Sequence, residues 1–282
     1  KVYNISDEEV VKKLKIGKNK FSHLKNNKNY NQFLLNKVVG KKVQKGFSNV
    51  SIDSKTLKKD DLFVAIKGEH KDGHDFIAES ISKGATNCIV SKKIKIVSKK
   101  KLIKTNNTKD FLVSLAKVKR MYTSAKILAV TGSSGKTTFK NLLANILRYY
   151  GKTFYSPKSY NNSFGVPLSL SNLNLQDEYG VFEIGMSKKG EINDLAKLVQ
   201  PNIGVITNVA EAHLENFKSI NGIAKAKGEI IDNINPNGHL ILNRDDRFFH
   251  YFFKKAKKKN LNVITFGLNN NADIYPLKIS EE

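Results

Sequence analysis

The 282-residue sequence contains very little of several residue types, and each shortage narrows what the protein can be. It has no tryptophan and one cysteine, Cys88, so it cannot form an internal disulfide. The apolar neighbours of Cys88 predict a small core residue rather than a nucleophile. No apolar run approaches the roughly 20 residues of a membrane span, and no secretory apolar segment opens the chain. We therefore expect a cytoplasmic protein without membrane insertion.

Arginine is also scarce, although the net charge is +24. Only four arginines occur, so 45 of the 49 basic residues are lysine, and these lysines are spread along the whole chain. Arginine is the residue that most often recognises phosphates and bases through two parallel hydrogen bonds. The charge therefore indicates a general bias toward lysine, and we predict no nucleic-acid partner. The alternative is a basic nucleic-acid binder with a nucleotide-dependent switch, which would show salt-dependent binding of DNA or RNA.

One glycine-rich segment carries the clearest chemical signal. Residues 131–138 read TGSSGKTT, between an apolar strand at 127–130 and a helix-like stretch at 139–147. Glycines allow backbone N–H groups to converge on an anion, and the following helix N-terminus adds its dipole. Lys136 would then reach the outer phosphates, and the Thr137 hydroxyl would bind Mg²⁺. The pattern predicts a phosphate-binding loop.

This loop is a short variant of the general G-x-x-x-x-G-K-[ST] pattern, because Val130 stands where the first glycine would fall. The alternative interpretation is a glycine-serine turn without function. The strand before the loop and the helix after it favour the phosphate loop.

The alternation of apolar strands and helical stretches predicts an α/β protein of two domains. Residues 1–105 would form a small N-terminal α/β domain, of which 1–45 are poorly patterned apart from a possible helix cap at Ser6 to Glu9. Residues 106–282 would form a doubly wound, mostly parallel sheet. In such sheets ligands bind beyond the carboxyl ends of the strands.

Polar residues follow several predicted strands of the second domain. Glu183 lies inside an apolar strand, and His213, Asn243 and Asp246 come after other strands, while Lys227 lies in a later helical stretch. Each residue alone is more often structural than functional. Because a buried carboxylate needs a partner or a metal, the set predicts a polar floor for Mg²⁺ and a nucleotide.

Five motifs, which occur along the chain in the order typical of the family, resemble the Mur ligases of bacterial peptidoglycan synthesis. They are the phosphate loop, EIGMSKKGEI at 183–192, NVAEAHLENFKSINGIAKAKGEI at 208–230, SIDSKTLKKDDLFVAIKGEHKDGHDF at 51–76 and YNNSFGVPLSL at 160–170. The resemblance extends from about residue 43 to 267. The module around Asp53, Ser54 and Lys55 separates the chain from the folate-polyglutamating relatives, which lack it.

The resemblance implies an ATP- and Mg²⁺-dependent ligase that forms an amide bond through an acyl phosphate. It is strongest to the family member that joins D-alanyl-D-alanine to UDP-N-acetylmuramoyl-tripeptide. We also expect a monomer. One alternative is another Mur ligase, which adds the third-position diamino acid. Another is a relative that binds a nucleotide or UDP-sugar without catalysis.

The resemblance also implies residue roles. Nucleotide contacts fall on Gly132, Ser133, Ser134, Gly135, Lys136, Thr137, Thr138, Asn243 and Asp246. Metal ligands fall on Thr137, Glu183, His213 and a carbamylated Lys227, with Lys136, Glu183, His213 and Lys227 as the catalytic set. Muramoyl-substrate contacts fall on Ser54, Lys55, Asn161 and Asn162.

Two of these roles depend on local chemistry. Carbamylation needs a neutral amine, so Lys227 must have a lowered pKa; outside this motif it would be one solvated lysine among 45. Lys55 stands where the family has arginine, which would replace a two-pronged phosphate contact by a point charge.

The family usually continues for about another 170 residues beyond the position of Glu282, an ordinary domain length. We therefore expect this chain to lack the C-terminal ligase domain, as a fragment or as a natural truncation. We also expect weak or absent ligase turnover from these 282 residues alone.

Overall fold

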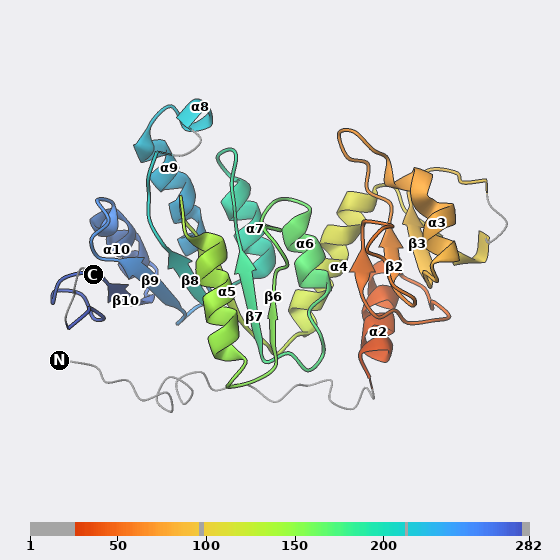
Figure 1. Cartoon of the computed structure of the whole chain (residues 1–282), viewed down its shortest axis with the longest axis horizontal. Coiled ribbons are helices and arrows are strands. Elements are labelled where there is room, and N and C mark those ends of the chain that lie inside the picture. The colour runs from red at the N-terminus through yellow and green to blue at the C-terminus, as the bar shows by residue number, and fades with distance from the viewer. Residues whose placement is uncertain (1–25, 96–98, 212–213, 278–282) are drawn as a thin grey trace, which may run out of the picture. The chain divides into compact units, whose positions relative to one another are not determined.

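The computed structural model describes residues 26–95, 99–211 and 214–277 (Figure 1). Within these ranges the chain forms two compact units, and it passes between them three times. The first unit contains 26–123 and Pro167–Gln176, and the second contains Ser124–Val166 and 177–277. The helix cap predicted at Ser6 to Glu9 lies outside the described residues.

The first unit has a four-stranded sheet in the order β1-β2-β3-β4, with every neighbouring pair parallel. Its strands are β1 (Val50–Ser51), β2 (Leu62–Val64), β3 (Asn87–Val90) and β4 (Leu102–Lys104). Its helices are α2 (Asn27–Val39), α3 (Ile77–Ser82) and α4 (Thr108–Tyr122), with short 3₁₀ segments at Gly73–Phe76 and Lys99–Lys101.

The two central strands of this unit, β2 and β3, are short and completely buried. Phe63 and Cys88 pack in one buried cluster with Ile77 of α3, as expected of a parallel sheet that is covered by helices. Cys88 is thus the core residue that its apolar neighbours predicted.

The edge strand β1 is closed by a side chain from the returning segment 167–176. Asn172 accepts a hydrogen bond from the Val50 backbone N–H (2.7 Å) and donates one to the Val50 carbonyl (3.0 Å). The amide group of Asn172 therefore satisfies both backbone groups of Val50, as a neighbouring strand would.

The second unit has a six-stranded sheet in the order β10-β9-β8-β5-β7-β6, again parallel throughout. Its strands are β5 (Lys126–Thr131), β6 (Thr153–Tyr155), β7 (Tyr179–Glu183), β8 (Ile203–Ile206), β9 (His239–Asn243) and β10 (Asn262–Phe266). Its helices are α5 (Lys136–Leu147), α7 (Glu191–Val199), α8 (Leu214–Phe217), α9 (Ile220–Lys227) and α10 (Phe249–Lys258), and a 3₁₀ segment covers Gly228–Asn233. Helix α6 (Gly165–Ser171) begins in the second unit and continues into the first. The predicted doubly wound, mostly parallel fold is confirmed.

The strand order places the centre of this sheet at β5. The chain first moves outward from β5 to β6 and returns to β7, and it then crosses β5 to reach β8, β9 and β10. Because right-handed crossovers in opposite directions put their helices on opposite faces, α5 and α7 cover the two sides of the sheet (Figure 1). The reversal opens a crevice at the carboxyl end of β5.

Strand register brings the predicted polar residues to this crevice. Glu183, the last residue of β7, is the partner of Val130 near the end of β5, and Thr131 is the partner of Ile206 on the other side. Three loops thus leave the sheet at one place, after β5, β7 and β8.

The first unit extends further along the chain than the sequence indicated. Helix α4 packs within it and its first segment ends at Thr123, whereas the sequence analysis placed the domain boundary after residue 105. No helix of the described residues is long and apolar enough to cross a membrane.

Candidate nucleotide and metal site

The phosphate loop runs from the end of β5 into α5, as its sequence predicts. Gly135 is the N-cap of α5 with φ +78°, a left-handed conformation that favours glycine. At Gly132 a Cβ would lie 1.8 Å from the Thr207 hydroxyl oxygen of the loop after β8. The first glycine therefore permits close packing of two loops, and the second permits the turn that aims the N-terminus of α5 at the crevice.

Lys136, the first residue of α5, lies against its own loop. Its ammonium donates to the Gly132 carbonyl at 2.8 Å and to the Ser133 carbonyl at 3.4 Å. Burial lowers the pKa of Lys136, while the negative charge of Glu183 opposes that shift. The loop therefore holds a partly buried cation beside its backbone amides, where an outer phosphate of a nucleotide would need one.

The two loop serines bind the loop that follows β8. Asn208 accepts from the Ser134 backbone N–H (3.1 Å) and donates to the Ser134 hydroxyl (3.0 Å). Ser133 donates its hydroxyl hydrogen to the Ala210 carbonyl (2.9 Å) and accepts from the Ala210 N–H (2.8 Å). Asn208, which the sequence reasoning did not single out, fixes the phosphate loop against its neighbour.

Asp246, in the loop after β9, supports the same region. Its carboxylate accepts hydrogen bonds from the Val209 and Phe248 backbone N–H groups at 2.7 and 2.8 Å. Asn243 ends β9 and accepts from the Asp245 N–H at 3.0 Å. In this structure Asn243 and Asp246 form hydrogen bonds that stabilise the loops at the carboxyl end of the sheet.

Glu183 is almost completely buried at the end of β7. One carboxylate oxygen accepts from the Thr137 hydroxyl at 2.8 Å, and the other accepts from the Asn161 side-chain amide at 2.8 Å. The structure therefore brings together a hydroxyl of the phosphate loop, a strand-end carboxylate and an amide of the 160–170 motif. Hydroxyl and carboxylate oxygens are the ligands that Mg²⁺ prefers.

A second lysine of α5, Lys140, lies beneath this carboxylate. Its ammonium is 3.5 Å from a Glu183 carboxylate oxygen and donates to the Lys158 carbonyl. Lys140 is completely buried. Its only distinguishing feature in the sequence is its position one helical turn after Lys136.

Lys227 ends α9 and is 3% exposed, which excludes the solvated alternative. Burial lowers the pKa of Lys227 to about 7, and the positive charge of Lys136 adds to the shift. A large fraction of this amine is therefore neutral near pH 7, the form that reacts with carbon dioxide.

Several of these residues, among them Lys136, Asn161 and Lys227, line one cavity of about 340 Å³, whereas Thr137 and Glu183 are not part of its lining. Its wall combines the phosphate loop, the asparagines of the 160–170 motif, the segment after β7 and the start of α7, together with Lys227. The lining residues are Thr131, Gly132, Ser133, Lys136, Asn161, Asn162, Ser163, Gly185, Met186, Ser187, Glu191, Asp194, Leu195 and Lys227.

The remaining predicted residues of this unit have varied positions. Asn162 lines the cavity and accepts backbone hydrogen bonds from Phe164 and Gly165. Thr138 is exposed on the first turn of α5. His213 lies outside the described residues. Within the described ranges, no cluster of three or more His, Cys, Asp or Glu side chains could hold a metal ion.

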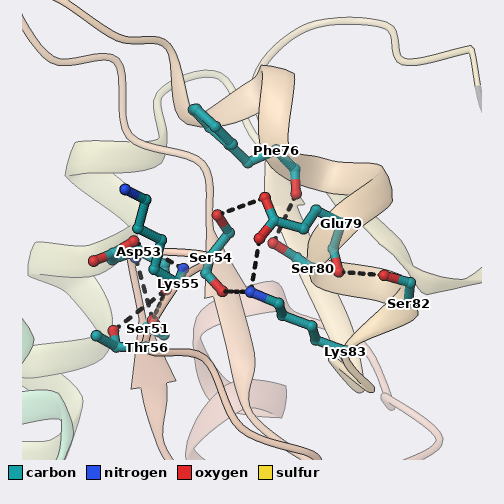
Figure 2. Close-up of polar contacts among 10 residues, drawn as sticks. All are labelled: Ser51, Asp53, Ser54, Lys55, Thr56, Phe76, Glu79, Ser80, Ser82 and Lys83. Atoms are coloured by element: carbon teal, nitrogen blue, oxygen red, sulfur yellow. Dashed lines mark hydrogen bonds and ion pairs between the residues drawn. The ribbon is translucent and has the colours of Figure 1, made fainter.

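The predicted substrate residues of the first unit belong to a polar cluster after β1 (Figure 2). Ser54 is buried, and its hydroxyl donates to the Glu79 carboxylate at 2.9 Å. Lys83 donates to the same carboxylate at 2.7 Å and to the Ser54 carbonyl at 2.9 Å. Lys55 has an exposed side chain directed away from this cluster (Figure 2). Of Ser54 and Lys55, only Lys55 therefore has a side chain that a ligand could bind without breaking a side-chain hydrogen bond such as that of Ser54 with Glu79.

The residues present suit a nucleotide and a divalent cation. The loop presents the N-terminus of α5 and a partly buried ammonium, and Thr137 and Glu183 place two hard oxygen donors beside them. Fold and site together define a parallel α/β protein with a phosphate-loop motif at the carboxyl end of β5.

Comparison with known proteins gives the family. Residues 46–124 match the Mur ligase family catalytic domain, and residues 130–282 match the Mur ligase middle domain. The chain therefore belongs to the Mur ligase family.

Two curated relatives have the name UDP-N-acetylmuramoyl-tripeptide–D-alanyl-D-alanine ligase. The protein of Rickettsia prowazekii is 39% identical over 226 residues, which cover 80% of this chain and 50% of that protein. The protein of Escherichia coli is 39% identical over 197 residues, 70% of this chain and 43% of that protein. The chain thus spans about half the length of the curated relatives it matches.

Solved structures agree. MurF from Acinetobacter baumannii superposes with a TM-score of 0.77 at 30% identity, over 88% of this chain and 55% of that one. MurF from Thermotoga maritima, solved in complex with ADP, gives 0.68 at 34% identity, over 79% and 51%.

Proposed function

We propose that this chain carries the nucleotide-binding and muramoyl-substrate-binding parts of an ATP-dependent ligase that joins D-alanyl-D-alanine to UDP-N-acetylmuramoyl-tripeptide in the cytoplasm. The observation that carries the proposal is the contact of Thr137 with Glu183 at the mouth of the phosphate loop. The relatives named for this reaction, and the related structure that holds ADP, support the substrate assignment.

In the first step the terminal carboxylate of the tripeptide would attack the γ-phosphate of ATP, giving an acyl phosphate and ADP. The amine of D-alanyl-D-alanine would then attack the acyl carbon and release inorganic phosphate. The chain's own residues bring negative groups together: Lys136 and the amides of the loop bind phosphates, and the cavity places Asn161 and Asn162 beside them. Mg²⁺ would neutralise phosphate charge next to the transferring group.

Metal binding is assigned to Thr137 and Glu183, with His213 and Lys227 as further ligands. Lys227 would act in its carbamylated form, which turns a buried amine into an anionic oxygen donor. Its burial and its lowered pKa support this assignment. Carbamylated Lys227 would also balance the positive charge of Lys136.

In the first unit, Lys55 is assigned to the diphosphate of the UDP-muramoyl substrate. Its ammonium is exposed, and the neighbouring Ser54 hydroxyl is held by Glu79. Asn243 and Asp246 are assigned to the adenosine end of the nucleotide in the second unit. Asp246 would act mainly through the loop that it holds at Val209.

The test is a binding and turnover series with the 282-residue chain. Calorimetry should show Mg²⁺-dependent ADP binding and a UDP-muramoyl-tripeptide affinity at least about tenfold above that for the dipeptide, a difference of 1.4 kcal/mol. A preference for the dipeptide would instead indicate the ligase of the third-position diamino acid. Phosphate release from Mg-ATP with tripeptide and D-alanyl-D-alanine measures turnover, and tight binding without release in a longer form of the protein would indicate a non-catalytic relative.

A further inference from the structure

Lys140 has a different environment from the lysine that precedes it by one turn of α5. Lys136 faces the cavity and binds the carbonyls of its own loop. Lys140 is completely buried and does not line the cavity. Two lysines on the same side of one helix therefore have separate partners.

The partners of Lys140 are Glu183 and the loop that precedes α6. Its ammonium lies 3.5 Å from the Glu183 carboxylate, and it donates to the carbonyl of Lys158. That loop also carries Asn161, which donates to the other oxygen of Glu183. Lys140 thus connects the phosphate-loop helix, the strand-end carboxylate and the asparagine loop.

A carboxylate buried as deeply as Glu183 needs partners in fixed positions around its oxygens. Thr137 and Asn161 are neutral donors, and Lys136 is engaged by Gly132 and Ser133. The ammonium of Lys140 is the cation within 4 Å of Glu183 among the residues that the structure describes. It can hold the carboxylate in a fixed orientation before a metal arrives.

Resting on the proposed function, we infer that Lys140 is a positioning residue for the metal site. It holds the Glu183 carboxylate in place beside Thr137, and through the Lys158 carbonyl it fixes the loop that carries Asn161. It acts on the use of the divalent cation and not by direct contact with the nucleotide.

The experiment compares ADP binding in EDTA and in saturating Mg²⁺ for the parent chain, Lys140→Met and Lys197→Met. Lys197 is an exposed lysine on α7 and serves as the matched control. In Lys140→Met we expect the affinity in EDTA to stay within about threefold, while the tightening produced by Mg²⁺ falls by at least about tenfold. Lys197→Met should match the parent in both conditions.

Two results would overturn the inference. An equal loss of affinity with and without Mg²⁺ would mean that Lys140 binds the nucleotide directly, and an unchanged Mg²⁺ effect would mean that Glu183 does not need it. Failure of the parent chain to bind ADP would count against the proposed function instead.

A second measurement covers the case in which Lys140→Met does not fold. The double variant Lys140→Met/Glu183→Gln removes both charges of the pair together. We expect it to recover most of the stability lost in either single variant, as measured by urea unfolding. A double variant as unstable as the sum of the two single variants would refute the coupling of Lys140 with Glu183.

Discussion

Two carboxylates, one in each unit, are held by the same kinds of partner but in opposite environments. Glu79 accepts from the Ser54 hydroxyl and pairs with Lys83 at 2.7 Å; its side chain is 41% exposed. Glu183 accepts from the Thr137 hydroxyl and lies 3.5 Å from Lys140; its side chain is 2% exposed. The pair with the shorter distance, Lys83 with Glu79, is therefore the one that is more exposed to water.

The N–O distance alone therefore does not decide how much an ion pair contributes to stability. Lys83 and Glu79 are four residues apart on or next to α3, and water screens their attraction. Lys140 and Glu183 come from different elements, and removing either leaves the other charge buried. The second unit therefore depends on its pair, whereas the first unit uses its pair mainly to orient Ser54.

The largest expected effect is on the stability of the second unit. Glu183→Gln keeps the shape of the side chain but leaves the Lys140 ammonium without its counter-charge. We expect a loss of about 3–5 kcal/mol in the free energy of unfolding. Urea unfolding of the variant and the parent measures this loss. A loss below about 1 kcal/mol would mean that the buried Glu183 pair contributes no more to stability than an exposed pair such as Glu79 with Lys83.

The next effect concerns nucleotide affinity and separates the two lysines of α5. Lys136→Ala removes the ammonium that lines the cavity, so ADP affinity should fall on the order of 100-fold both with and without Mg²⁺. Calorimetry measures both constants, and Lys197→Ala is the surface control. Unchanged affinity would contradict the assignment of the phosphate loop.

A third effect appears in the pH dependence of stability. The pKa of Lys227 is lowered by burial to about 7 in the folded chain, against 10.5 for an ordinary lysine. The unfolded chain therefore binds more protons above about pH 7, so stability should rise from there toward pH 10 by at most about 1.4 kcal/mol per pH unit. Below that range this gain is absent.

The measurement is urea unfolding of the parent and Lys227→Met between pH 6 and pH 9, in buffer free of carbon dioxide. The methionine variant should lack the rise that Lys227 produces. Equal pH profiles for the two proteins would show that Lys227 titrates as a solvated lysine does.

The smallest effect belongs to the exposed pair. Glu79 has its pKa lowered by hydrogen bonds from Lys83 and Ser54, but it faces water. Glu79→Gln should shift the unfolding midpoint far less than Glu183→Gln in the same assay. Equal shifts for the two variants would contradict the expected difference between the exposed pair and the buried pair.

Much of the second unit could be predicted because its signals are local. The strands β5, β7, β8, β9 and β10 are apolar runs, and the phosphate loop is a contiguous motif. Glu183 stood out because a charge interrupts an apolar strand. The structure confirms the parallel fold and places Glu183 against Thr137.

The remaining features depend on contacts between distant segments. Lys140 is one lysine among 45, and its burial follows only once β7 lies beneath α5. Asn208 matters because Gly132 lets two loops approach closely. Helix α2 was missed because its sequence is mostly polar, with few buried apolar residues. The segment Pro167–Gln176 shows no sign in its own sequence that it joins the first unit.

The contact between Asn172 and Val50 has a practical consequence for dissecting the protein. A gene fragment that stops at Thr123 would encode every strand of the first sheet but not the amide group that closes β1. The unpaired backbone groups of the edge strand β1 would then pair with other copies of the fragment and cause aggregation. A soluble version of that half needs residues 167–176 supplied as well, by a linker or as an added peptide.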